Sequence, residues 1–221
     1  MTELLDESRR RLPASFPIFP LPGAILLPGA QLPLNIFEPR YLRMIDDALA
    51  GERMIGMIQP RLEQRENDDA PVLYDVGCAG RIISFQETED RRYLITLAGK
   101  QRFCVKTELH SDMPYRSIVA DWERFEIDFH KDDTGSTVDR DLFLAVMREY
   151  LELEGLKTDW KAAESAPIEA LVASLAMGCP FPANEKQALL EAMTTSDRTD
   201  CLIALMEMSG TNDPDDHGML Q

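Results

Sequence analysis

The density of proline near the N-terminus is the feature that most limits how this chain can fold. Seven of the 14 prolines lie between Pro13 and Pro39, in the segment PASFPIFPLPGAILLPGAQLPLNIFEPR. Proline fixes φ and lacks an amide donor, so this segment is neither a helix nor a fully paired inner strand. The pattern predicts a short edge strand, two turns and a second strand, at Pro17–Pro20, Pro22-Gly23, Pro28-Gly29 and Gln31–Ile36.

A helix is expected directly after the second strand. Pro39 suits the first turn of a helix and Gly51 suits its end. The apolar side chains between them recur at helical spacing and define one buried face: Tyr41, Leu42, Ile45 and Leu49. The chain then returns as a strand over Met54–Gln59.

The next part of the sequence has the pattern of a β-meander. Residues 61–71 lack periodicity and predict a surface loop. Gly77 and Gly80 suggest a bulge or a close backbone approach, and Gly99-Lys100 suggests a turn. The strands are expected over Val76–Thr88, Tyr93–Leu97, Arg102–Glu108 and Arg116–Phe125. Six or seven strands with one helix predict a small barrel-like sheet.

After Thr134 the periodicity becomes helical and stays so. The expected helices begin near Val138, Ile168, Asn184 and Asp197, the last two capped by Asn184 and by Asp197 or Ser196. The fold class is therefore α+β. We expect an N-terminal extension (1–14), a β-rich domain (15–130), a helical bundle (131–210) and a disordered tail (211–221).

Charge is distributed unevenly along the chain and limits the classes of partner. The net charge is −16, and residues 121–221 hold 22 acidic but only 8 basic side chains. A nucleic acid would be repelled by this half and would find no strong basic field on the other. Nucleic-acid binding is therefore not expected, and the alternative interpretation of the acidity is that it only provides solubility.

Cysteine usage and hydropathy indicate a cytoplasmic protein. The four cysteines are far apart and form no C-x-x-C pair. Spacing of this kind in a chain without a secretion signal is typical of buried thiols. The N-terminus has no apolar core of a signal peptide, and the most apolar stretch is interrupted by prolines, so no membrane partner is expected.

The motifs of common enzymes are missing from the sequence. There is no G-x-x-x-x-G-K-[ST] and no G-x-G-x-x-G, so neither a P-loop nor a dinucleotide site is supported. The three histidines, at positions 110, 130 and 217, fall in a turn, at the domain boundary and in the tail. Cys78 and Cys104 lie in apolar strands and are interpreted as inert thiols. We predict no catalytic residue, no cofactor and no metal site.

The order of these motifs resembles one family over residues 15–208. The stretch FPIFPLPGAILLPGAQLPLNIFEPRYLRMIDDALAGERMIGMIQ (Phe16–Gln59) is similar to the start of the Lon protease N-terminal, substrate-binding domain. G-x-x-G-R-I at Gly77–Ile82 and L-x-G-x-x-R-F at Leu97–Phe103 resemble its meander, and Pro182–Ala192 resembles the helices of stand-alone bacterial members, which lack the ATPase and the peptidase.

The resemblance implies a PUA-like β pseudo-barrel with one helix, followed by a helical bundle. It also implies a non-catalytic module that binds a protein or an unfolded polypeptide in protein quality control. Within that interpretation, the expected groove rim is the strand-to-helix junction, at Phe37, Glu38, Arg40 and Tyr41. The alternative for these residues is a structural Glu38–Arg40 ion pair with Tyr41 in the core.

Two other functions stay open at this point. One is an uncharacterised hydrolase with a site between the two halves, which a cavity with convergent titratable groups would support. The other is a structural homodimer in which an edge of the meander pairs with its twin.

Overall fold

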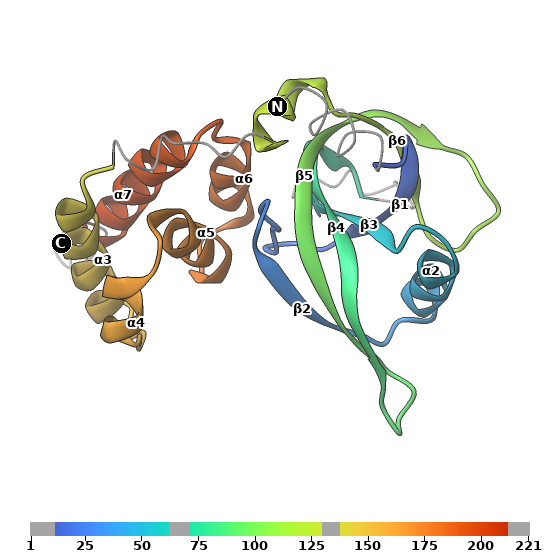
Figure 1. The fold of residues 1–221 in the computed structure, drawn as a ribbon, viewed down its shortest axis with the longest axis horizontal. Helices are drawn as coiled ribbons and strands as arrows, with labels where there is room; N and C mark the ends of the chain where they lie inside the picture. The colour runs from blue at the N-terminus through green and yellow to red at the C-terminus, as the bar shows by residue number, and fades with distance from the viewer. Residues whose placement is uncertain (1–11, 62–70, 130–137, 212–221) are drawn as a thin grey trace, which may run out of the picture.

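The computed structural model describes residues 12–61, 71–129 and 138–211, and the side chains of residues 12–61, 71–129 and 138–209. A barrel-like sheet and a group of helices lie side by side (Figure 1). The sheet contains β1 (Ser15–Pro20), β2 (Gln31–Ile36), β3 (Met54–Pro60), β4 (Leu73–Glu87), β5 (Tyr93–Leu109) and β6 (Ser117–Asp121). The helices are α2 (Pro39–Ala50), η1 (Glu123–Phe129), α3 (Arg140–Leu153), α4 (Trp160–Ser165), α5 (Ile168–Gly178), α6 (Ala183–Glu191) and α7 (Thr195–Thr211). The expected α+β fold with a pseudo-barrel is confirmed.

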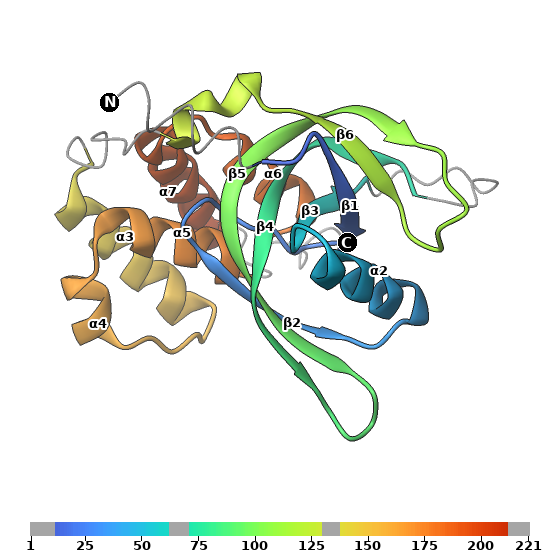
Figure 2. The ribbon, with the colours of Figure 1, turned by 45° about the vertical axis from the view of Figure 1, so that its right-hand side comes forward.

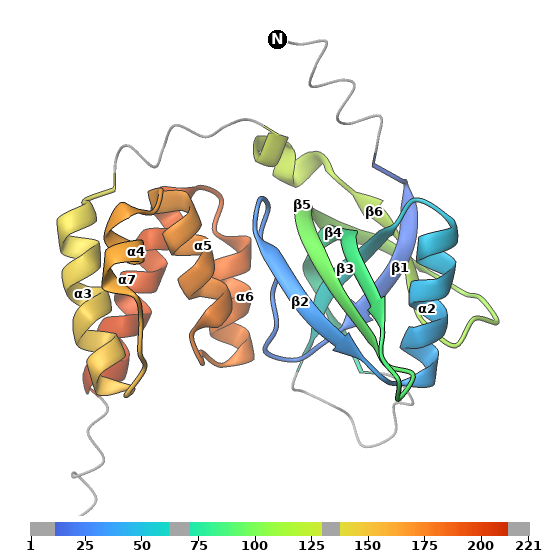
Figure 3. The same ribbon diagram turned by 60° about the horizontal axis from the view of Figure 1, so that its bottom comes forward.

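Five of the strands pair in a closed ring. The sheet order is β2-β5-β4-β3-β1-β6, and a further pairing of β5 with β6 joins the two ends of the last five strands. β1 and β3 are parallel, and the other pairs are antiparallel. β2 stays outside the ring and extends it along β5. Figure 3 shows α2 on the side of the barrel away from the other helices and β2 on the side nearest to them.

The strand β1 is not the edge strand that its prolines predicted, because it pairs on both sides. Its first half pairs with β6 and its second half with β3. The amide of Ile18 donates to the carbonyl of Arg116 on the β6 side, at 2.9 Å. Because the direction of the backbone nitrogen alternates along a strand, the nitrogen of Pro17 faces β3 and that of Pro20 faces β6. Neither proline lies among the residues that pair with the strand its nitrogen faces. Half-pairing on each side is how an inner strand accommodates two prolines.

Gly99 does not form the predicted turn, and β5 continues through it as one strand of 17 residues. The loop before β2 crosses β5 at this point. The amide of Gly29 donates to the Gly99 carbonyl (3.1 Å), and the amide of Gly99 donates to the Ala30 carbonyl (2.9 Å). A Cβ at Gly99 would lie 2.0 Å from the backbone oxygen of Leu27. The glycine permits two backbones to cross.

The other glycines of the meander have the role that the sequence predicted. The pairing of β4 with β5 shifts register between Ala79 and Gly80, which is a bulge. A Cβ at Gly77 would lie 2.5 Å from the backbone oxygen of Met57, which is a close approach.

β6 ends earlier than predicted, at Asp121, because the Asp121 carboxylate accepts the amide of Glu123 (2.9 Å) and starts a turn into η1.

Most helices agree with the periodicity, but their caps differ. α3 begins after Asp139, whose carboxylate accepts the amide of Leu142. Asn184 lies inside α6, whose N-cap is Pro182. At α7 the amide of Asp197 donates to the Thr194 hydroxyl, and the amide of Thr194 donates to the Asp197 carboxylate. The predicted caps Asn184, Ser196 and Asp197 are therefore wrong, and α4 was too short for its period to be recognised.

Buried polar contacts join the helices to the barrel. Gln59 of β3 donates to the carbonyl of Ala183 (2.9 Å) and to the side chain of Gln187 (3.1 Å), and Gln187 donates to the carbonyl of Val76. The main cluster of buried apolar side chains also extends through both halves. Figure 2 shows α6 and α5 next to the sheet, with α3 and α4 farther out. The predicted boundary between the halves, at residues 130 and 131, lies outside the described residues, as do the start of the predicted extension and nearly all of the tail.

Candidate functional site

The predicted groove rim lies where β2 ends and α2 begins. Glu38 is the N-cap of α2 in an extended conformation, and its side chain makes no capping bond. Pro39 opens the helix, as its fixed φ and missing amide favour. The carboxylate of Glu38 is therefore free to project from the surface, next to the first turn of the helix.

A cleft of about 620 Å³ opens beside this junction. It lies where the end of β1, the start of α2 and the residues before β6 meet, and proline side chains make up much of its wall. Its lining comprises Phe19, Pro20, Leu21, Pro22, Glu38, Arg40, Tyr41, Pro60, Arg61, Pro71, Pro114, Tyr115 and Arg116. The structure thus brings together three of the four predicted residues, Glu38, Arg40 and Tyr41, in one cleft.

Phe37 does not belong to this lining. Its side chain is 63% exposed, which makes it one of the most exposed large apolar side chains among the described residues. It is the residue before Glu38 in the chain, so its exposed ring lies at the junction but outside the cleft lining.

Tyr41 forms part of the floor of the cleft and of the core at once. It is only 6% exposed, and its ring centroid lies 4.4 Å from that of Phe19. The guanidinium of Arg40 lies over the Tyr41 ring, 4.5 Å from its centroid. Burial raises the pKa of the Tyr41 hydroxyl above its ordinary value, and the charge of Arg40 offsets part of that rise.

Glu38 and Arg40 form the ion pair that was the alternative expectation for these residues. Their side chains approach to 2.8 Å and are 44% and 52% exposed. An exposed pair of this kind contributes about 0–1 kcal/mol to stability. The pair and the packing of Tyr41 are therefore present, and both side chains of the pair still face the cleft.

Two further residues of the cleft lining, Tyr115 and Arg116, were not recognised from the sequence. The Tyr115 hydroxyl donates to Asp47 of α2 at 2.8 Å. Burial, this hydrogen bond and the charge of Asp47 together raise the pKa of Tyr115 to about 12. Tyr115 and Arg116 lie more than 70 positions after Glu38 in the chain. No local pattern connects them to the junction.

The arginines that line the cleft each pair with a carboxylate, which for two of them lies outside the lining. Arg116 pairs with Glu108 at 2.6 Å and Arg61 pairs with Asp75 at 3.1 Å. The hydrogen bond from Arg116 holds the pKa of the Glu108 carboxyl below its ordinary value. Because each lining arginine has a carboxylate partner, the cleft offers apolar and aromatic contacts rather than a strong field of one sign.

The two strand cysteines that could act as nucleophiles lie in β4 and β5. Cys78 is fully buried, as predicted, and burial raises the pKa of its thiol. Cys104 is half-buried beside Arg124, and burial again raises the pKa of its thiol. Within residues 12–61, 71–129 and 138–211, no three or more His, Cys, Asp or Glu side chains converge as metal ligands would.

A second cavity lies between the two halves, where the alternative hydrolase site was expected. Its volume is about 600 Å³, and it is bounded by the start of β2 and by α5. Glu169 is the one ionisable side chain in its lining. A cavity with a single titratable group does not have the convergent acid, base and nucleophile that hydrolysis requires.

Within the part of the chain that the structure describes, no helix is both long enough and apolar enough to cross a bilayer.

Comparison with known proteins identifies relatives over most of the chain. The model of the ATP-dependent protease La (LON) substrate-binding domain family matches residues 15–208. The Lon protease of Anaeromyxobacter dehalogenans (strain 2CP-C) is 27% identical over 201 residues, which is 90% of this chain. Lon protease 2 of Myxococcus xanthus is 26% identical over 207 residues, also 90% of the chain. The chain spans 24% of the length of each of these relatives.

Two solved structures share the fold. A Lon N-terminal domain protein from Xanthomonas campestris superposes with a TM-score of 0.59 at 23% identity, covering 86% of this chain and 97% of that protein. The N-terminal domain of the Mycobacterium avium complex Lon protease gives a TM-score of 0.60 at 17% identity, covering 87% and 98%. With the family model matched from residue 15 to residue 208, the chain belongs to the family of the ATP-dependent protease La (Lon) substrate-binding domain.

Proposed function

We propose that this protein is a non-catalytic module that captures polypeptide segments of protein clients in the cytoplasm. The family supports this function, because its description names a substrate-binding domain. In this proposal the β-rich domain, residues 15–130, carries the binding site, and the helical bundle, residues 131–210, supports it.

The observation that carries the proposal is the cleft at the strand-to-helix junction. It is open to solvent, has about the volume of known ligand sites, and is lined by proline and aromatic side chains with compensated charges. Such a surface suits apolar side chains of an unfolded segment, because it offers buried area without demanding a charged group. Phe37 adds exposed apolar area next to it.

The first prediction concerns Phe37→Ala and Arg40→Ala. Either change should weaken binding of an unfolded protein about fivefold to tenfold, or about 1–1.4 kcal/mol, because each removes a side chain that contacts the client. The thermal midpoint should stay nearly unchanged, because Phe37 is exposed and the Arg40–Glu38 pair is a surface pair. Reduced and carbamidomethylated ribonuclease A, which stays unfolded, is a suitable probe in a fluorescence titration.

Arg43→Ala is the matched control. Arg43 is also an exposed arginine of α2 in an ion pair, with Asp47 at 2.8 Å, but it lies outside the cleft lining. It should bind the probe like the unsubstituted protein. Equal losses of binding and of thermal midpoint in the Phe37 and Arg40 variants would assign these residues to packing and contradict the proposal.

A further inference from the structure

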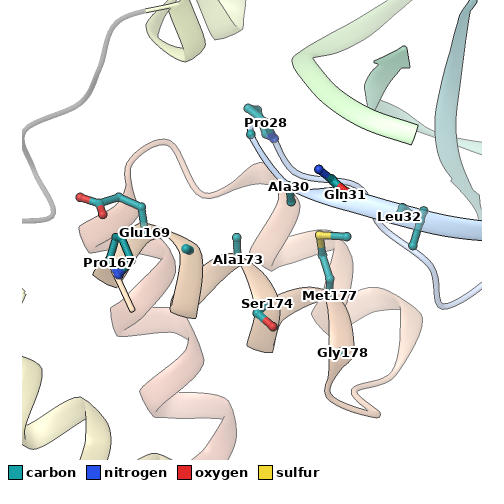
Figure 4. Close-up of a pocket in the computed structure, with 12 residues that line it drawn as sticks. Pro28, Ala30, Gln31, Leu32, Pro167, Glu169, Ala173, Ser174, Met177 and Gly178 are labelled. Atoms are coloured by element: carbon teal, nitrogen blue, oxygen red, sulfur yellow. The ribbon is translucent and has the colours of Figure 1, made fainter. Parts of the chain in front are cut away.

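The cavity between the two halves combines a strand edge with a helix face (Figure 4). One wall is the start of β2 and the turn before it, and the other is α5, with about 600 Å³ between them. Apart from Glu169, Gln31 and Ser174, its lining side chains are apolar or absent: Pro28, Gly29, Ala30, Leu32, Pro167, Ala170, Ala173, Met177 and Gly178. The volume lies within the range of sites that hold a ligand.

The α5 wall is a single helical face with short side chains. Counted from Ala170, the other lining residues of this helix lie three, four, seven and eight positions later, so they share one side of it: Ala173, Ser174, Met177 and Gly178. Figure 4 shows Ala173 and Met177 directed toward β2. The short side chains leave the space unfilled, and the flexible thioether of Met177 can adapt to different apolar groups.

The β2 wall has an unpaired backbone edge. β2 is the terminal strand of the sheet within the described residues. The amide of Gly99 in β5 donates to the carbonyl of Ala30, so the backbone of Ala30 faces β5. In an antiparallel pair, the backbone groups of successive residues point alternately toward and away from the partner strand. The backbone groups of Gln31, Pro33 and Asn35 therefore point away from β5, along the open edge. Gln31 and Asn35 offer a donor and an acceptor each, and Pro33 offers only an acceptor.

We infer that the edge of β2 and the cleft toward α5 form a docking site for an extended polypeptide segment. The segment adds to the sheet as a further strand and places apolar side chains against α5. Main-chain hydrogen bonds of this kind recognise any extended chain, whereas the cleft selects side chains. The inference rests on the proposed polypeptide binding and assigns it a second surface.

Charge determines which extended segments fit. Glu169 is the one charged group in the lining, and it belongs to the half in which acidic side chains outnumber basic ones by 22 to 8. A segment with lysine or arginine beside its apolar residues is attracted to this wall, and a segment with acidic flanks is repelled. The occupant is therefore an apolar extended segment with basic flanks.

The geometry of the edge also disfavours an identical copy as the occupant. Pro33 lies in the middle of the open stretch and supplies no donor, which is a common protection of edge strands against pairing with each other. A guest segment with amides at every position can still donate to the Pro33 carbonyl.

The test uses a fluorescein-labelled peptide of alternating valine, threonine and leucine between two pairs of lysines, titrated with the full chain. Ala170→Trp, which fills the cleft from an exposed position, should weaken binding at least about tenfold. Gln31→Pro, which removes an outward donor that β5 does not use, should weaken it about fivefold. The same peptide with alternate amides N-methylated should lose binding, because its side chains remain but its main-chain donors do not.

The matched control for Ala170→Trp is Ala162→Trp, an exposed alanine of α4 outside the cleft. It should bind like the unsubstituted protein, and the peptide with glutamates in place of lysines should bind more weakly. Hydrogen exchange should show that the amides of Gln31 and Asn35 become protected when the peptide binds.

The outcomes separate this site from the junction cleft. If Ala170→Trp and Gln31→Pro bind the peptide normally while Arg40→Ala loses unfolded ribonuclease A, the β2 site is wrong and the proposed function stands. If the chain binds neither probe, both are wrong. If light scattering shows a dimer that Gln31→Pro dissociates, a second copy occupies the edge and the inference is overturned.

Discussion

At the scale of single residues, Gly99 shows how a close backbone contact can require glycine at one position. Its φ is not in the left-handed region, so it is not needed for a turn. It is needed because the backbone of Leu27 passes where a Cβ would lie. A glycine between two strand-like runs predicts a turn from sequence, and the crossing loop that explains it lies some 70 positions away.

The prediction at this scale is that Gly99→Ala destabilises the fold by about 1–3 kcal/mol. The clash is with backbone, at 2.0 Å, so no side chain can move to relieve it. Gly51→Ala is the control, because its nearest backbone neighbour would be 3.6 Å away. Urea unfolding would measure both, and similar midpoints for the two variants would contradict the role given to Gly99.

At the scale of elements, the first residue of each helix shows how far nearby side chains determine where a helix begins. Asp139 caps α3 and Asp159 caps α4 through their carboxylates, at 3.0 and 3.1 Å from the amides that they accept. At α7 several residues of the segment Thr194-Thr195-Ser196-Asp197 are good caps, and propensity alone does not choose among them. The reciprocal bonds of Thr194 and Asp197 form a capping-box arrangement and set the start of the helix.

Removing that cap gives a second stability prediction. Thr194→Ala should cost about 1 kcal/mol, because it leaves the Asp197 amide without its acceptor. Thr195→Ala, one position later, changes the same side chain without touching the two capping bonds and should cost less. Thermal unfolding followed by circular dichroism would compare them, and a larger loss for Thr195→Ala would place the cap elsewhere.

At the scale of the molecule, Arg102 holds the helices to the barrel. It extends from β5, is 1% exposed, and donates to the carbonyls of Leu190 and Met193 at the end of α6, each at 3.0 Å. Asp128 of η1 pairs with it at 2.6 Å. Arg198 also donates to carbonyls at this end of α6, and burial with the nearby charge of Arg102 lowers the pKa of Arg198 to about 10. The negative end of the α6 dipole favours both cations.

The prediction at this scale compares two ion pairs that involve η1. Arg102→Leu should destabilise the protein by about 3–5 kcal/mol, because it leaves the buried Asp128 carboxylate without its cationic partner. Arg124→Leu removes the pair with Glu191 of α6, which is 3.2 Å long and exposed, and should cost less than about 1 kcal/mol. Denaturant titration of both variants, with Arg102→Leu/Asp128→Leu as a third, would test this. The double variant should recover part of the loss, and equal costs for the two arginines would refute the difference.

The local sequence determined the elements whose cause is local. The bounds of β2, the opening of α2 at Pro39 and the α5 segment follow from period and proline geometry, and with them the position of Glu38, Arg40 and Tyr41. The tertiary structure decided which distant segments meet: β1 between two partners, Tyr115 and Arg116 in the cleft at the junction, and α5 across from the edge of β2. Periodicity reports which face of an element is apolar, but register and long-range pairing decide what that face contacts.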